Sequence, residues 1–217
     1  AGFGPLRIDQ LGEANRTPMP EQLDAMRRHV SRAMCDGALG LSTGLFYPPQ
    51  NFSKTEEVIE LAKVAARHGG LYDSHIRDES MYNIGLKGSI EEVIRIGREA
   101  RLPVHVAHIK ALGVDVQGQS GDIIRRIEKE RAAGLDITAD HYPWTASSTR
   151  FSAALLPPWA NEGGRTAMLQ RFDDACVQLL DDDPWHLGRR DDAIQLVDFV
   201  TWHAGFRDGR HVGKDRR

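Results

Sequence analysis

Apolar runs recur along the chain at a regular spacing, and each run ends in polar or chemically reactive residues. The four runs are Ala38 to Thr43, Leu71 to His75, Val104 to His108 and Asp136 to Asp140. Their first residues lie about 32 positions apart, and helix-like segments fill the intervals. Because a parallel connection between strands needs a crossover of about a dozen residues or more, this pattern predicts parallel βαβ units.

The segments between the runs carry apolar residues at helical spacing, together with start and stop signals. One helix is expected to begin near residues 18–20 and to end at Gly37. The stretches Ser53 to Glu56 and Ser89 to Glu92 each match a capping box, in which Ser and Glu side chains satisfy free N–H groups of the first turn. A further helix, with an isoleucine stripe, is expected to end at Gly134.

This alternation predicts an α/β fold. A doubly wound open sheet and an eightfold barrel share the pattern, and the regular period favours the barrel. No Gly-x-Gly-x-x-Gly or Walker loop follows any run, which weakens the nucleotide-binding alternative. A complete barrel needs about 250 residues, whereas these four units occupy about 140, so we expect a partial (β/α)8 barrel of about four βα units.

Composition narrows the function classes. The 217 residues include 28 Lys plus Arg and 31 Asp plus Glu, a formal net charge of −3, so nucleic acid is not an expected partner. Two cysteines, Cys35 and Cys176, are too few for a disulfide framework and point to a reducing compartment. With no membrane-spanning stretch and no signal peptide, we expect a cytoplasmic protein. The sequence begins at Ala1 without an initiator Met, and we expect it to be part of something longer.

Two histidines give the sharpest chemical signal. His75 and His108 each close an apolar run, one repeat apart. Neighbouring parallel strands lie about 4.8 Å apart, so two imidazoles at adjacent strand ends can converge on one ion with Zn–N bonds of about 2.1 Å. The alternative is that each is a hydrogen-bonded core or loop histidine. Two imidazoles suit Zn, Ni, Co and Fe about equally, so the pattern does not identify the metal.

Residues around the histidines suggest a pocket. Lys110 could hold a substrate carboxylate or be a solvated loop lysine, and Tyr142 could donate to an anionic ligand or pack under a loop. Asp140 and His141 are expected at most to support the ligands. His105, three positions before His108, is expected to face the outer helices.

The run Arg77 to Glu79 is expected to be a solvated surface of mutually paired charges. Cys35 is expected to be incidental, near the end of an amphipathic helix.

Several motifs together resemble the zinc-dependent N-acyl-D-amino-acid deacylases (D-aminoacylases) of the amidohydrolase superfamily. The resemblance covers about residues 5 to 175, and its motifs are Gly37 to Pro49, Ser74 to Glu79, His108 to Lys110, Tyr142 to Pro143, Thr145 to Thr149 and Leu155 to Trp159. It implies an eight-stranded barrel with a small β-domain, and hydrolysis of N-acyl-D-amino acids to a carboxylate and the D-amino acid.

By the same resemblance, His75 and His108 correspond to metal-binding histidines at the ends of the fifth and sixth barrel strands, so the four units correspond to strands four to seven. Lys110 and Tyr142 correspond to positions that bind the substrate's α-carboxylate. The implied cofactor is one Zn²⁺ ion, which polarises the scissile carbonyl and acidifies a water, while an Asp moves the proton.

The departures from the family set the remaining expectations. The family's His-x-His pair, ligand Cys and general-base Asp have no counterpart here, nor does its small β-domain. Residues 176–217 are expected to be a divergent charged tail after a partial barrel over 1–175. We therefore expect the isolated chain to be weakly active or inactive. Two alternatives stay open: a non-catalytic remnant that self-associates through unpaired strand edges, and another divalent-metal α/β-barrel enzyme.

Overall fold

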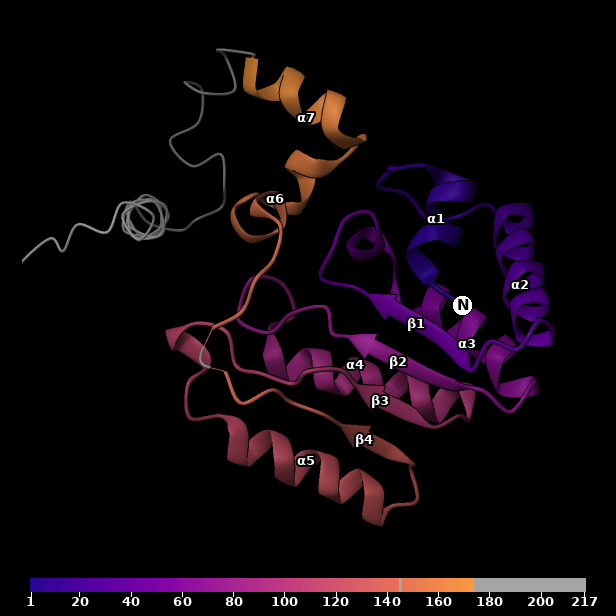
Figure 1. Cartoon of the computed structure of the whole chain (residues 1–217), viewed down its shortest axis with the longest axis vertical. Helices are drawn as coiled ribbons and strands as arrows, with labels where there is room; N and C mark the ends of the chain where they lie inside the picture. The colour runs from indigo at the N-terminus through magenta and orange to yellow at the C-terminus, as the bar shows by residue number, and fades with distance from the viewer. Residues whose placement is uncertain (145, 174–217) are drawn as a thin grey trace, which may run out of the picture. The chain divides into compact units, whose positions relative to one another are not determined.

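The computed structural model describes residues 1–144 and 146–173, and its centre is a four-stranded parallel sheet (Figure 1). The strands are β1 (Gly40–Gly44), β2 (Leu71–His75), β3 (Val104–Val106) and β4 (Ile137–Ala139), in the spatial order β1-β2-β3-β4. Sequential neighbours in a parallel sheet require a crossover between each pair, and α3 (Thr55–Arg67), α4 (Gly85–Ala100) and α5 (Ser120–Ala132) provide them. The predicted α/β class and the four strands are confirmed.

The remaining elements lie before this unit, in its loops and after it. They are α1 (Phe3–Leu11), α2 (Pro20–Cys35), α6 (Phe151–Leu155), α7 (Gly164–Asp173) and the short 3₁₀ helices η1 (Gln50–Phe52), η2 (Val114–Val116) and η3 (Pro158–Asn161). The chain divides into two compact units, Ala1–Met168 and Leu169–Arg217, and the sheet belongs to the first. The predicted tail at 176–217 lies outside the described residues. No helix within the described ranges is long and apolar enough to cross a membrane.

One face of the sheet forms the core. Leu41, Tyr72, Val104 and Ile137 are aligned across the four strands, and each is at most 2% exposed. The core continues into the apolar stripes of α3, α4 and α5. Close strand packing also explains a glycine, because a Cβ at Gly40 would lie 2.0 Å from a β2 carbonyl oxygen. This core fixes the strand ends relative to one another.

The helix predictions were right in position, but the two predicted capping boxes were wrong. The helix expected from near residues 18–20 is α2, and Cys35 is its exposed last residue. Neither capping box forms: α3 begins at Thr55 without a side-chain cap, and α4 begins at Gly85, which leaves Ser89 inside the helix. The hydroxyl of Ser89 instead accepts the backbone N–H of Asp78 at 2.8 Å.

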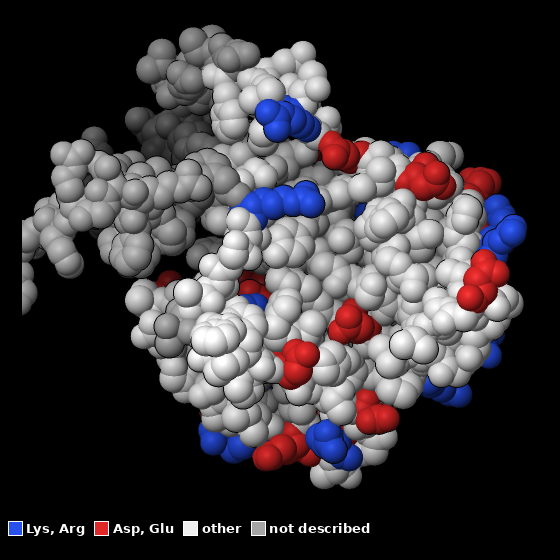
Figure 2. Space-filling model, in the orientation of Figure 1, with Lys and Arg blue, Asp and Glu red and all other residues white. Residues whose placement is uncertain are grey.

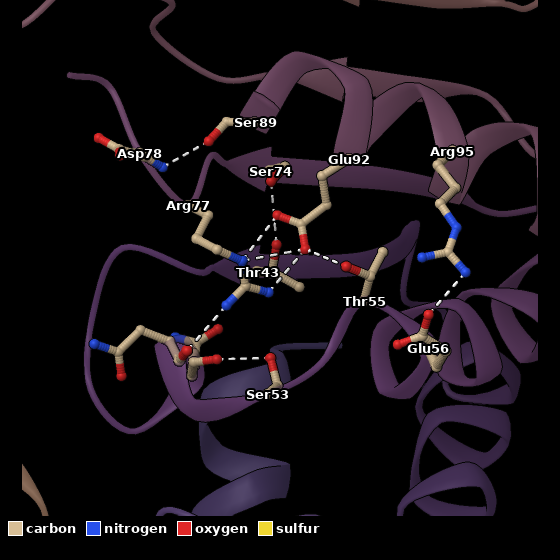
Figure 3. A network of polar contacts seen from close by, with 12 residues as sticks. Thr43, Ser53, Thr55, Glu56, Ser74, Arg77, Asp78, Ser89, Glu92 and Arg95 are labelled. Carbon is tan, nitrogen blue, oxygen red and sulfur yellow. Dashed lines mark hydrogen bonds and ion pairs between the residues drawn. The ribbon is translucent and has the colours of Figure 1, made fainter. Parts of the chain in front are cut away.

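The charged run after β2 is buried, so the expectation of a solvated surface was wrong. Arg77, Asp78 and Glu79 are 7%, 0% and 4% exposed. Arg77 donates to Glu92 of α4 from Nε at 2.9 Å and from Nη2 at 2.8 Å (Figure 3). Burial is possible because each charge has a partner, and the network ties the loop after β2 to α4. Elsewhere, on the face shown in Figure 2, acidic and basic side chains are scattered rather than gathered into a basic field.

Candidate metal centre

The two predicted histidines meet at the carboxyl ends of β2 and β3. His75 is the last residue of β2, and His108 lies two positions beyond β3 with a positive φ of 37°. His75 Nδ1 is 2.9 Å from His108 Nε2, and the ring centroids are 4.5 Å apart. Asp140 accepts the backbone N–H of His108 and so supports this turn. The structure thus brings the imidazoles together from adjacent strands.

Hydrogen bonding determines which ring nitrogens of His75 and His108 carry a proton. Lys110 Nζ lies 2.9 Å from His108 Nδ1, and because an ammonium only donates, Nδ1 is the acceptor. The proton of neutral His108 is therefore on Nε2 and is donated to Nδ1 of His75. The proton of neutral His75 is then on Nε2. Burial, followed by electrostatic interaction with His108 and Lys110, lowers the pKa of His75 to about 3, which keeps this ring neutral.

Glu79 is the residue of the site that the sequence interpretation missed. Its carboxylate is buried, forms an ion pair with Lys110, and places Oε1 3.5 Å from His108 Nδ1 and 3.8 Å from His75 Nε2. The sequence held one signal for this role. Glu79 lies four residues beyond the end of β2, at the edge where active residues of parallel sheets gather. The adjacent charged residues Arg77 and Asp78 made Glu79 look like part of a solvated surface.

A pocket of about 370 Å³ opens beside the two histidines and includes Lys110 and Tyr142. Aromatic side chains supply much of its wall: the Tyr47 ring centroid is 4.9 Å from that of His75, and Trp144 also lines the pocket. Tyr142 lies with its ring centroid 5.6 Å from Lys110 Nζ. All four predicted site residues therefore line one cavity. A second pocket, of about 410 Å³, lies at the opposite ends of the strands and contains no histidine or nucleophile.

His75, Glu79 and His108 form a group suited to a metal ion. One ligand atom from each lies within 4.8 Å of the others. Imidazole nitrogen and carboxylate oxygen are the donors that zinc and related ions take in proteins. The Nε2 atom of His75 is buried without a hydrogen-bond partner, which shows that the protein's own hydrogen bonds do not fully satisfy the group. The residues present fit a divalent metal ion.

His105 occupies the site-facing side of the sheet, so its expected packing against the outer helices was wrong. It is aligned with Asp73 and Thr138, and its Nδ1 atom lies 2.8 Å from Thr138 Oγ1. The expectation extended strand alternation to His108, but β3 ends at Val106, and the turn that follows reorients the His108 ring. His141 is exposed, and its Nδ1 atom lies 3.3 Å from the carbonyl oxygen of its neighbour Tyr142.

Comparisons with known proteins agree on one group of enzymes. No protein-family model matches the chain. A D-aminoacylase from Alcaligenes xylosoxydans xylosoxydans is 38% identical over 148 residues, which is 68% of this chain and 30% of the relative. A crystal structure of D-aminoacylase, described as defining a novel subset of amidohydrolases, matches with a TM-score of 0.61 and 36% identity over 65% of this chain and 29% of that one.

A second matching structure was solved with zinc and an inhibitor bound. N-acyl-D-glutamate deacylase from Bordetella bronchiseptica, complexed with zinc and a phosphonate inhibitor that mimics the tetrahedral intermediate, matches with a TM-score of 0.61 and 32% identity. The match covers 65% of this chain and 29% of that one. The chain therefore spans about a third or less of these proteins, and its α/β sheet matches part of their structures, as predicted for a partial barrel.

Proposed function

We propose that this chain, which is homologous to part of D-aminoacylase and N-acyl-D-glutamate deacylase, contributes the metal-binding and carboxylate-binding part of a hydrolase of N-acyl-D-amino acids. The predicted resemblance to this family is confirmed. The observation that best supports the proposed function is the convergence of His75, His108 and Lys110 on one pocket. Hydrolysis of the amide would release a carboxylate and the D-amino acid.

His75 and His108 are the residues that would hold the metal, and zinc is the ion we propose. A bound zinc ion supplies Lewis-acid polarisation of a carbonyl and a water of lowered pKa. The protein's contribution is to keep the His75 ring neutral, and therefore able to coordinate, and to fix both rings at strand ends. The aromatic side chains around His75 reduce the access of bulk water to the reacting bond.

Lys110 and Tyr142 would hold the α-carboxylate of the substrate. The ammonium of Lys110 provides charge, the hydroxyl of Tyr142 provides a donor, and both side chains line the pocket that contains the histidines. A carboxylate held at one point and an acyl carbonyl held at another fix two groups of the substrate, and D and L substrates then place the side chain in different directions. Contact of that side chain with the pocket wall is the third interaction by which the site would distinguish D from L substrates.

Binding measurements test this function without requiring turnover. The zinc-loaded full chain is titrated with an N-acetyl-D-amino acid, its L enantiomer and the N-acetyl amine that lacks the carboxylate. We expect the D compound to bind most tightly, and Lys110→Met to remove its advantage over the amine, because the charge-assisted hydrogen bond is lost. The exposed Lys54 supplies a control, Lys54→Met, which should change nothing. Equal affinity for all three compounds would contradict the proposal.

Self-association is a second candidate function. The site-facing side of the sheet exposes Leu71, at 37%, and the described residues place no further strand beyond β4. An unpaired strand edge and an exposed apolar side chain on the sheet each favour association with another chain. Light scattering during gel filtration tests this: a concentration-dependent dimer that Leu71→Lys dissolves supports association, and a monomer at all concentrations argues against it.

A further inference from the structure

Two loops at the carboxyl ends of the strands expose large apolar side chains. Met81, Tyr82 and Ile84, between β2 and α4, are 61%, 67% and 44% exposed, and Val114, at the start of η2 between β3 and α5, is 73% exposed. We call these four residues the rim patch. No charged residue occurs in 80–86 or in 111–114. Exposed apolar side chains that gather in one place mark a binding surface, whereas single scattered ones need no explanation.

The two loops lie side by side and lead away from the pocket that contains the histidines. Glu79 and Leu112 both line that pocket, and the carbonyl of Glu79 accepts the N–H of Leu112 at 2.7 Å. One residue further along both loops, a Cβ at Gly113 would lie 3.1 Å from Ser80 Oγ. The next residue of each loop belongs to the rim patch, so the patch begins where the pocket wall ends.

The loop between β2 and α4 holds its part of the rim patch in place. The buried carboxylate of Asp78 accepts the backbone N–H groups of Ser80, Asn83 and Gly85 at 2.8, 2.6 and 2.9 Å. The backbone N–H of Asp78 is donated to the hydroxyl of Ser89 on α4, as Figure 3 shows. A surface that is ordered before binding loses little conformational entropy when a ligand covers it. Three of the four rim residues are therefore preorganised for binding.

The size and charge of the rim patch select its occupant. A surface without Lys or Arg does not attract an anionic membrane, and one without any charge does not attract a charged peptide. A stable interface with a second copy of this chain uses about 20–30 residues on each side, far more than four side chains supply. A single aliphatic chain needs only a narrow apolar track that leads out of a polar site, and the two loops provide one.

We propose that the substrates of this site carry a long aliphatic chain, which leaves the pocket and lies along the rim patch. The inference rests on the proposed function, because it names the class of N-acyl-D-amino acid that the same pocket takes. Lys110 and the histidines would hold the carboxylate and the carbonyl inside the pocket, so an apolar extension is the part that reaches the rim. The chain belongs either to the acyl group or to the α-carbon, and both attachments present the same chemistry to the rim patch.

Calorimetric titration of the zinc-loaded full chain tests the inference. The ligands are N-acetyl-D-alanine, N-octanoyl-D-alanine and N-acetyl-D-2-aminodecanoic acid, which carry no long chain, one on the acyl group and one on the α-carbon, all below the concentration at which they form micelles. We expect one of the two long compounds to bind about 10- to 100-fold more tightly than N-acetyl-D-alanine, because each buried methylene contributes a factor of about four. The compound that gains affinity identifies the point of attachment.

The outcomes separate this inference from the proposed function. A gain below about threefold for both long compounds would overturn the inference and leave the proposed function intact, because such a gain is less than one buried methylene supplies. If none of the three compounds binds, the proposed function fails as well.

A double substitution ties the gain to the rim patch. Met81→Ser/Val114→Ser should weaken binding of the better long compound by about tenfold and leave that of N-acetyl-D-alanine unchanged. The matched control is Leu39→Ser/Ile124→Ser, since these side chains are also exposed, at 82% and 54%, but lie outside the two loops. Equal losses in the two double variants, or no loss in either, would overturn the inference.

Light scattering tests the other occupant of this surface. We expect the unsubstituted chain and Met81→Ser/Val114→Ser to have the same mass in solution. A dimer that this double substitution dissociates would make the rim patch an interface between copies and would overturn the inference.

Discussion

Breaking the buried ion pair behind the site should cost much of the chain's stability. Arg77 and Glu92 have side chains that are 6% and 5% exposed. The guanidinium donates to Glu92 from Nε and Nη2 and to the carbonyl of Asn51 from Nη1 at 2.9 Å. Glu92→Gln keeps the shape but leaves a buried guanidinium without its counter-charge, for which we expect a loss of about 3–5 kcal/mol.

Urea unfolding followed by far-ultraviolet circular dichroism measures this loss. The control is Glu91→Gln on the same helix, since Glu91 is 53% exposed and pairs with Arg126, so its loss should cost at most about 1 kcal/mol. The double variant Arg77→Met/Glu92→Leu removes both charges and should recover most of the stability lost in Glu92→Gln. A cost for Glu92→Gln no greater than that of Glu91→Gln would refute the reasoning.

Three further outcomes follow from the structure. Gly97→Val should lower the free energy of unfolding by about 1–3 kcal/mol, since a Cβ there would lie 2.7 Å from Val104 Cγ1; an unchanged urea midpoint would contradict this packing. The metal-free chain should lose stability as the pH falls from 6.5 towards about 3, because His75 binds a proton when unfolded but not when folded; His75→Gln should remove that component, and an unaltered pH profile in the variant would exclude it. The zinc-loaded chain should hydrolyse N-acetyl-D-amino acids weakly or not at all, so rapid release of the D-amino acid, followed by chromatography, would contradict the expectation of an incomplete catalytic set.

The sequence predicted the strands well because apolar runs report burial directly. The run Leu71 to His75 coincides with β2, and the other three strands fall within or one residue beyond their predicted runs. Periodicity also located the crossover helices. The capping boxes failed because both serine hydroxyls have other partners: Ser89 accepts the backbone N–H of Asp78, and Ser53 donates to the carbonyl of Gln50.

The candidate site was predicted in part. His75, His108, Lys110 and Tyr142 line one pocket, as their positions at strand ends and loops suggested. Glu79 was missed because a run of charges along a sequence is normally solvated, and only the partners contributed by α4 and the next loop make its burial possible.

Zinc titration of the full chain by calorimetry tests the central claim most directly. The claim is that His75 and His108 together hold the metal. We predict one ion per chain at this site, with binding lost in His75→Ala and in His108→Ala and retained in the exposed control His141→Ala. Zinc binding that is unchanged in both His75→Ala and His108→Ala would contradict the account.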